Sequence, residues 1–488
     1  MGRELGGDRR CHRLGHHNGG RGEGAPVRFQ TPLPLVESRQ FRLVAAGDLA
    51  TLNDSWRVHL TDSSQIQSPR LHAFDGLRAA MMLLGLVLHA ACNYQDSPPD
   101  PIWNFRDPQG SPIFGLLILY IHLWRMPIFM FIAGFFSALL VERRSAGSFI
   151  SNRLSRLGLP MLLFLPFMVP LTISAFIFAN GTRSLGRIEG GLDAVSSLET
   201  ANMFPPITIH LWFLYYLLLF CICAFFLVRG GRRSDGVDPR GIITRILGFL
   251  TMAPGGTIVL CLPLVFLLKN SAGLLMTGAT LIPEPTSFFT YGFIYLCGWS
   301  FWGQRTHLDR LRSWPRCIGS ILVTILLFPF WLEFFLQWIG LPPGELTRSI
   351  CTALGVETPG RETVMWIGSG MSALMMWNGI WGFLGLCQLI LNREIPAIRY
   401  IVDGSYWVYI IHLPFTVWIP GLLVNEEFGA FPKFLITLSG TTLIGFLTYE
   451  WFVRSSWIGQ LLNGRRWPRA LGRALRNRDL VEPEEQSI

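Results

Sequence analysis

Long runs of apolar residues, repeated from residue 76 to residue 453, constrain this 488-residue chain more than any other feature. Most of the runs approach the ~20 residues that an α-helix needs to cross a bilayer. Half of the chain is hydrophobic and only 15% is charged, whereas ordinary soluble domains carry about 25% charge. A soluble enzyme, a disulfide scaffold and a disordered chain are therefore excluded. The sequence predicts an all-α, polytopic membrane helix bundle.

About ten transmembrane helices are predicted, because backbone groups in lipid must be satisfied within the chain and helices are the only open-chain solution. The fifth run contains Pro254, Gly255 and Gly256, and the sixth is short. The ten runs are 76–94, 113–141, 157–179, 206–228, 248–268, 286–302, 317–339, 364–391, 402–424 and 433–453.

The basic residues are almost all arginine, and they are concentrated in alternate loops. The formal net charge of +9 would favour nucleic-acid binding in a soluble protein, but no aromatic-interleaved basic motif accompanies it. Basic loops of membrane proteins stay on the cytoplasmic side. An even number of spans with a basic segment at each end therefore predicts that both termini are cytoplasmic.

Composition divides the chain into three parts. Residues 1–70 hold no long apolar run, which predicts a disordered cytoplasmic tail, and they lack the apolar core of a signal peptide. A membrane domain is expected over 71–456, followed by a basic cytoplasmic tail over 457–488. The nine cysteines lie mostly inside apolar runs and their spacing predicts neither a disulfide framework nor a metal site.

Four of the ten histidines, accompanied by one arginine, fall inside the predicted spans, where insertion of a charged group costs about 2.5–3.5 kcal/mol. A single buried histidine is more simply explained as a core residue bonded to a neighbouring helix. Five such groups in one bundle instead favour a polar working cavity. The residues are His89, His122, Arg125, His210 and His412.

The first span places Arg78 and His89 on one helix face, because eleven residues return to within about 20° and rise roughly 16 Å. Asp75 is positioned to pair with Arg78. Snorkelling to the interface would explain Arg78 but not His89.

Arg153 and Arg156, spaced i, i+3, are predicted to form a fork suited to phosphate oxygens. The alternative is that the two arginines only anchor this loop on the cytoplasmic side.

Several common catalytic motifs are absent from the sequence. There is no P-loop, dinucleotide fingerprint, H-E-x-x-H or G-x-S-x-G motif. With these motifs absent, the sequence favours a mechanism in which an intramembrane histidine acts as general base and an arginine balances anionic charge.

Taken together, these motifs resemble acyltransferase family 3, the polytopic membrane O-acyltransferases, and within it the branch associated with succinylation of osmoregulated periplasmic glucans. The family's pattern in the first span is a basic residue followed, after ten intervening positions, by a histidine, and Arg78 and His89 fit it. Arg153 and Arg156 fit the family's R-x-x-R pattern. The match runs in order over about residues 71–456; the long N-terminal tail and the outer loops depart from it. The branch's F-D-x-x-R, H-x-x-R-M, H-L-W-F-L and Y-x-x-H appear at Phe74 to Arg78, His122 to Met126, His210 to Leu214 and Tyr409 to His412.

The resemblance implies an inner-membrane O-acyltransferase that moves a succinyl or acetyl group from cytoplasmic acyl-CoA to a hydroxyl of a periplasmic or envelope glycan. Its partners would be acyl-CoA, the glycan, the lipid bilayer and glucan-synthesis proteins; no nucleic acid, metal or permanently bound cofactor is expected. His89 would be the general base, and Arg78, Arg153 and Arg156 would bind the donor phosphates. The further catalytic candidates are Arg78, Asp75, His122, Arg125 and His210, and the acceptor contacts expected are Trp212 and His412.

Two other classes of function stay open at this point. A transporter or exporter with a histidine–arginine relay would predict inverted repeats and broken spans in matching halves, and neither is evident. A non-catalytic membrane partner of a glucan-synthesis complex would keep the bundle without needing Arg78 and His89 on one face.

Overall fold

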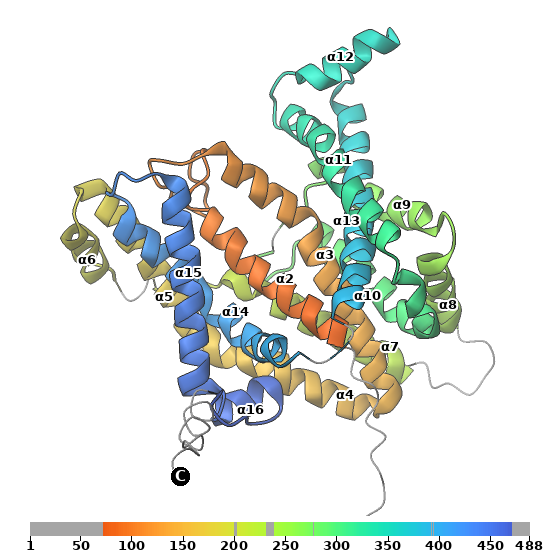
Figure 1. Cartoon of the computed structure of the whole chain (residues 1–488), viewed down its shortest axis with the longest axis horizontal. Coiled ribbons are helices and arrows are strands. Elements are labelled where there is room, and N and C mark those ends of the chain that lie inside the picture. The colour runs from red at the N-terminus through yellow and green to blue at the C-terminus, as the bar shows by residue number, and fades with distance from the viewer. Residues whose placement is uncertain are drawn as a thin grey trace, which may run out of the picture. The chain divides into compact units, whose positions relative to one another are not determined.

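The computed structural model describes residues 72–199, 203–230, 239–276, 278–391, 393 and 395–470. All of them belong to one compact unit, Pro69–Ile488, and long helices dominate the described part of the chain (Figure 1). The tail predicted over 1–70, and the C-terminal tail beyond residue 470, lie outside the described residues.

Eight helical segments in the described part of the chain are long and apolar enough to cross a membrane. They confirm the predicted all-α, multi-pass membrane bundle, and each coincides with one of the predicted runs. The segments are α2 (His72–Ala91), α3 (Pro112–Arg143), α4 (Ala146–Arg153) with η1 (Leu154–Gly158) and α5 (Leu159–Leu185), η3 (Ile209–Leu211) with α7 (Trp212–Gly230), α11 (Trp314–Trp338), α13 (Arg361–Ile390), α14 (Pro396–Leu423), and α15 (Ala430–Thr448) with η6 (Tyr449–Val453).

The fifth and sixth predicted runs differ from these. The fifth falls on α8 (Pro239–Met252) and α9 (Gly256–Leu268), which are bent by 116° at the Pro254–Gly255 break and would add a ninth span if they cross as one broken segment. Gly255 has φ 73° at this break, a conformation that suits glycine. The sixth run forms α10 (Pro285–Phe301), whose 17 residues are fewer than the ~20 that a bilayer requires.

Short helices complete the described chain. Several long helices, among them α3, α10 and α14, begin at proline, whose missing N–H needs no partner in a first turn. The short elements are α6 (Ile188–Ser196), η4 (Lys269–Ser271), η5 (Trp302–Leu311), α12 (Glu345–Leu354) and α16 (Trp457–Asn463).

Helix α14 organises the part of the bundle that carries the candidate site. It packs against α2, α5 and α15, while α2 packs against α3, and α3 packs against α10. Gly134 of α3 and Gly298 of α10 each face a backbone carbonyl of the opposite helix, those of Tyr295 and Phe131. Small residues allow such close helix contact in membranes.

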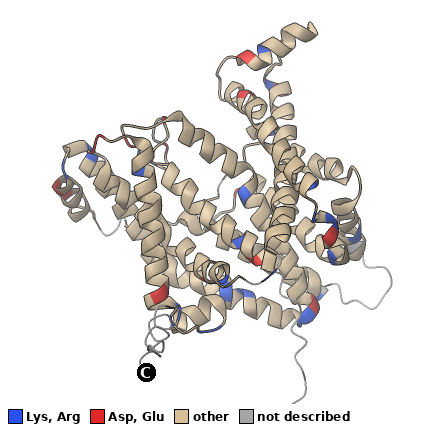
Figure 2. Ribbon diagram, in the orientation of Figure 1, with Lys and Arg blue, Asp and Glu red and all other residues tan. Residues whose placement is uncertain are grey.

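Charged residues are sparse along the long helices, as the ribbon in Figure 2 shows. Basic residues gather at the end of the bundle where α4 and α16 lie. This distribution agrees with the positive-inside assignment of that end. The cytoplasmic location of the termini stays a prediction.

Candidate active site

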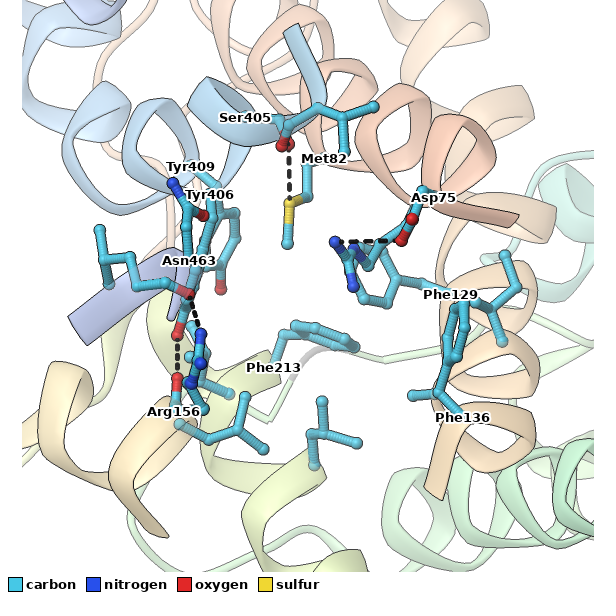
Figure 3. A pocket seen from close by; sticks show the side chains of 18 of the residues that line it. Asp75, Met82, Phe129, Phe136, Arg156, Phe213, Ser405, Tyr406, Tyr409 and Asn463 are labelled. Carbon is cyan, nitrogen blue, oxygen red and sulfur yellow. Dashed lines mark hydrogen bonds and ion pairs between the residues drawn. The ribbon is translucent and has the colours of Figure 1, made fainter. Parts of the chain in front are cut away.

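A cavity of about 330 Å³ lies between α2, α3, α4, η1, α7, α14 and α16. In Figure 3, Arg156, Tyr406, Tyr409 and Asn463 form one wall, and Phe129 and Phe136 lie opposite. The cavity therefore has aromatic side chains on two sides and a lining that combines polar with apolar groups. Its arginines are Arg78, Arg153, Arg156 and Arg399.

Three of these arginines were predicted as donor-binding residues, and the fold brings all three to one cavity. Arg78 forms the predicted ion pair with Asp75, at 3.5 Å. Arg153 donates to the hydroxyl of Ser137 on α3, at 3.3 Å. Arg156 donates to the carbonyl oxygen of Leu462 in α16, at 3.1 Å.

The R-x-x-R segment spans two successive helical elements, and the predicted phosphate fork stays a prediction. Arg153 ends α4, and Arg156 lies in the π-helical turn η1 that follows it. Such π turns are rare and are often found at functional sites. Ser137 of α3 accepts from Arg153, and Leu462 of α16 accepts from Arg156, so that different elements hold the two guanidinium groups on the wall of the same cavity.

Arg399, at the start of α14, is an additional basic residue of the cavity. Its guanidinium makes two hydrogen bonds to the carboxylate of Asp403, of 2.9 and 2.6 Å. The side chain of Asn463 donates to the backbone oxygen of Asp403, at 2.9 Å. Arg399 is therefore paired closely with a carboxylate. The ion pair of Arg78 with Asp75 is longer, and Arg153 and Arg156 donate to neutral oxygen atoms.

Three of the predicted histidines come together where α2, η3 and α14 meet. Nδ1 of His89 on α2 and Nε2 of His412 on α14 are 2.8 Å apart, and the two rings are parallel within 3°. The ring of His210 in η3 lies across that of His412, with centroids 4.9 Å apart. Residues separated by up to 323 positions thus form one histidine cluster, consisting of His89, His210 and His412.

Pro414 of α14 exposes a backbone carbonyl that binds the histidine cluster. Because Pro414 has no N–H, the carbonyl of Ile410 loses its helical partner, and it accepts instead from His210 Nε2 at 2.9 Å. The hydroxyl of Tyr409 donates a hydrogen bond to the carbonyl oxygen of His210, at 2.7 Å. His210 follows Ile209, whose φ of 45° is unusual for a β-branched residue.

The loop after α2 covers His89. The indole of Trp103 stacks on the imidazole of His89 with centroids 5.6 Å apart, and its N–H donates to the Asn93 side chain. Asn93 in turn donates to the carbonyl oxygen of Thr416, at 2.8 Å. Pro420, four residues further along α14, frees that carbonyl.

The other predicted residues have separate surroundings. Arg125 donates from Nε to the carbonyl of Met81, at 2.8 Å, and its guanidinium lies over Gly85, one turn before His89. His122 bonds the carbonyl of Leu275 and is not part of the histidine cluster. Trp212 packs against the rings of Tyr216 and Tyr291.

Tyr409 connects the cavity to the histidine cluster. Its side chain lines the cavity, and its hydroxyl bonds the backbone of His210. Helix α2 runs alongside without an internal proline, so that Arg78 and His89 share a face about 16 Å apart, as predicted. Tyr409 and helix α2 therefore connect the arginines of the cavity to the histidine cluster.

Several residues of the site were not predicted. Asn93, Trp103, Asp403 and Arg399 belong to none of the motifs that the sequence offers. Their roles depend on contacts between helices, for which one sequence contains no signal. Pro414 and Pro420 were visible in the ninth run, and the rule that proline frees the carbonyl four residues earlier would have identified two polar acceptors there.

The chain matches a family model described as an acyltransferase domain over residues 71–450. It is 25% identical over 413 residues to the glucans biosynthesis protein C of Escherichia coli (strain K12), with 82% of this chain and 96% of that protein covered. The proteins of the same name from Escherichia coli O81 (strain ED1a) and Escherichia coli O157:H7 match with the same identity and coverage. No solved structure matches the chain.

Proposed function

The chain belongs to the acyltransferase family whose model covers residues 71–450, and on that basis we propose that it transfers an acyl group from acyl-CoA to a hydroxyl of an envelope glycan. The relatives named glucans biosynthesis protein C support a glucan as the acceptor. We further propose an inner-membrane protein with a membrane domain over 71–456, cytoplasmic termini, and a succinyl or acetyl group as cargo.

One observation carries this proposal: a single cavity has arginines on its wall and touches the histidine cluster through Tyr409. Guanidinium groups bind phosphate oxygens through paired N–H donors. The aromatic side chains of the cavity suit the uncharged pantetheine arm. The ~16 Å rise from Arg78 to His89 is compatible with the length of that arm, which would bring the thioester to the histidines.

In the proposed reaction, the acceptor oxygen attacks the thioester carbonyl carbon while its proton passes to His89. The resulting oxyanion lies near Arg125, whose guanidinium is one helical turn from His89. The carbon–sulfur bond then breaks, and the thiolate takes the proton back from His89. The products are the glycan ester and free CoA, and His89 is regenerated.

The donor site is tested by CoA binding to the purified protein in lipid nanodiscs. The double variant Arg153→Ala/Arg156→Ala should weaken binding at least about a hundredfold, because two charge-assisted contacts at ~1.5–3 kcal/mol each are lost. Arg310→Ala/Arg312→Ala is the matched control, since these arginines lie outside the cavity. Equal affinities for the two variants would contradict the proposed donor site.

The reaction is tested by transfer of a labelled acyl group from acyl-CoA to purified envelope glucan in detergent solution. We expect a covalently labelled glycan with the native protein and none with His89→Ala at equal protein levels. A transporter needs a sealed compartment, so that transfer in detergent separates an enzyme from the exporter alternative. Transfer that persists in His89→Ala would remove His89 as the base.

Mass spectrometry of envelope glycans from cells with and without the gene identifies the cargo and acceptor. The missing mass per modified sugar distinguishes a succinyl group from an acetyl group. Glycans that are unchanged by loss of the gene would exclude an envelope glycan as acceptor.

A further inference from the structure

We propose that His412 is a positioning residue: its Nε2 accepts a hydrogen bond from His89 Nδ1 and so holds His89 in the tautomer whose Nε2 takes up the substrate proton. This inference rests on the proposed function of His89 as general base. It assigns to His412 a role other than the acceptor contact expected from the sequence.

The backbone of α14 determines the tautomer of His412. Nδ1 of His412 lies 2.7 Å from the carbonyl oxygen of Tyr409. A carbonyl oxygen has no proton, so Nδ1 of His412 is the donor in this bond. In a neutral imidazole the other nitrogen is then an acceptor, which leaves a lone pair on Nε2 of His412.

That lone pair decides the tautomer of His89. Nε2 of His412 and Nδ1 of His89 are 2.8 Å apart, and a hydrogen bond at this distance needs one proton. Since Nε2 of His412 has none, Nδ1 of His89 supplies it. His89 therefore carries its proton on Nδ1, and its Nε2 has the free lone pair that a general base requires.

The surroundings keep this arrangement rigid. His412 is 1% exposed, and His210 lies across its ring with the planes 81° apart. On the other side, Trp103 stacks on His89. The two imidazoles stay parallel within 3°, so that neither ring rotates without breaking packing on both sides.

The same contact serves the charged intermediate. When the acceptor hydroxyl gives its proton to Nε2, His89 becomes a cation with a proton on each nitrogen. The Nδ1 proton stays hydrogen-bonded to Nε2 of His412, and a hydrogen bond from a charged donor is stronger than one between neutral groups. The Nε2 proton then goes to the leaving thiolate, and the neutral pair is restored.

The first test needs no activity. In native protein labelled with ¹⁵N-histidine and reconstituted in lipid, the ¹⁵N signals of His89, identified by their loss in His89→Gln, should show a protonated Nδ1 and an unprotonated Nε2. A proton on Nε2 in place of Nδ1 would overturn the inference. If the tautomer is as stated but His89→Ala still transfers acyl groups, the inference holds and the proposed function of His89 fails.

The second test is kinetic and compares two variants at position 412. In His412→Gln, the side-chain oxygen reaches the position of Nε2 and still accepts from His89, so kcat should stay within about tenfold of the native value. His412→Leu removes the acceptor, and kcat should fall about 10²-fold, a large part of a general-base contribution. KM for acyl-CoA should be unchanged in both, because His412 does not line the arginine-bearing cavity.

The outcomes divide clearly. Rescue by glutamine together with loss in leucine supports positioning, and an alkaline displacement of the kcat–pH profile in the native protein relative to His412→Leu would support stabilisation of the His89 cation. Equal kcat in the two variants would overturn the inference. Should either variant fail to fold, the tautomer measured on the native protein decides.

Discussion

The ring of His210 donates from Nε2 to the carbonyl oxygen of Ile410, 2.9 Å away and 200 residues further along the chain. This carbonyl is available because Pro414, four residues later, has no N–H to offer. Thr416 and Pro420 repeat the relationship, with Asn93 as the donor at 2.8 Å. Proline in α14 thus serves the site by exposing acceptors rather than by bending the helix alone.

Replacing Pro414 by alanine should therefore reduce activity more than stability. The new N–H competes with His210 for the Ile410 carbonyl, so His210 loses part of its anchor. We expect kcat to fall by about tenfold, equivalent to one neutral hydrogen bond at about 1.4 kcal/mol. The melting temperature should stay the same or rise, because alanine is favourable inside a helix.

Pro329→Ala is the control for this change. Pro329 lies inside α11, a helix that contributes no residue to the cavity lining. Its replacement should leave kcat unaltered. An undiminished kcat in Pro414→Ala would show that the proline is not needed to hold His210.

The sequence predicted the fold class because bilayer-length apolar runs leave helices as the only solution. Arg78 and His89 were placed on one face by helix geometry alone, and α2 has the continuous form that this requires. Asp75 was assigned to Arg78 on the same local grounds, and the 3.5 Å pair confirms it. Residue spacing along the sequence thus predicts which side chains of one helix share a face or form a pair.

Relationships between helices were not accessible in the same way. His89 and His412 are 323 positions apart, and their contact depends on how α14 packs on α2. Arg399 resembles any other loop arginine in sequence, yet it lines the cavity beside Asp403. The π turn η1 also leaves no signal in spacing, because it forms within an otherwise regular helical pattern.

Gly464 offers a way to displace Arg156 without changing any charge. Gly464 has φ 80° after α16, and a Cβ there would collide with the Arg156 guanidinium. Gly464→Ala should raise KM for the acyl-CoA donor severalfold and leave kcat at saturation nearly unchanged. Gly355→Ala is a matched control, because Gly355 also has a positive φ, 65°, but faces open space. Both variants incur about 1 kcal/mol of backbone strain, so a KM effect shared equally by both would contradict the role of Arg156.

Gly85 tests the position of Arg125 in a similar manner. A Cβ at Gly85 would meet the guanidinium of Arg125, which is held to the Met81 carbonyl. Gly85→Ala should shift that group away from His89 and lower kcat about tenfold, with little change in KM for the donor. Gly370→Ala, at a helical glycine of α13 that faces open space, should keep native kinetics. Native kcat in Gly85→Ala would argue against oxyanion stabilisation by Arg125.

The loop that covers His89 is fixed by an ion pair remote from the chemistry. Lys433 of α15 donates to Asp107 at 2.8 Å, and both side chains are fully buried. The backbone N–H of Asp107 donates to the carbonyl of Asn93, at 2.7 Å, and Asn93 holds Trp103 over His89. The pair therefore links α15 to the loop that carries Trp103.

Replacing Lys433 by methionine should destabilise the protein strongly, because it leaves the Asp107 carboxylate buried without its cation, at a cost of about 3–5 kcal/mol. Thermal unfolding in detergent measures the loss. The double variant Lys433→Met/Asp107→Asn should recover most of it, since no uncompensated charge remains. Lys269→Met, at the one other lysine of the chain, should have a smaller effect, because Lys269 is partly exposed and contacts aromatic rings. If the double variant is no more stable than Lys433→Met, charge compensation is not what the buried lysine supplies.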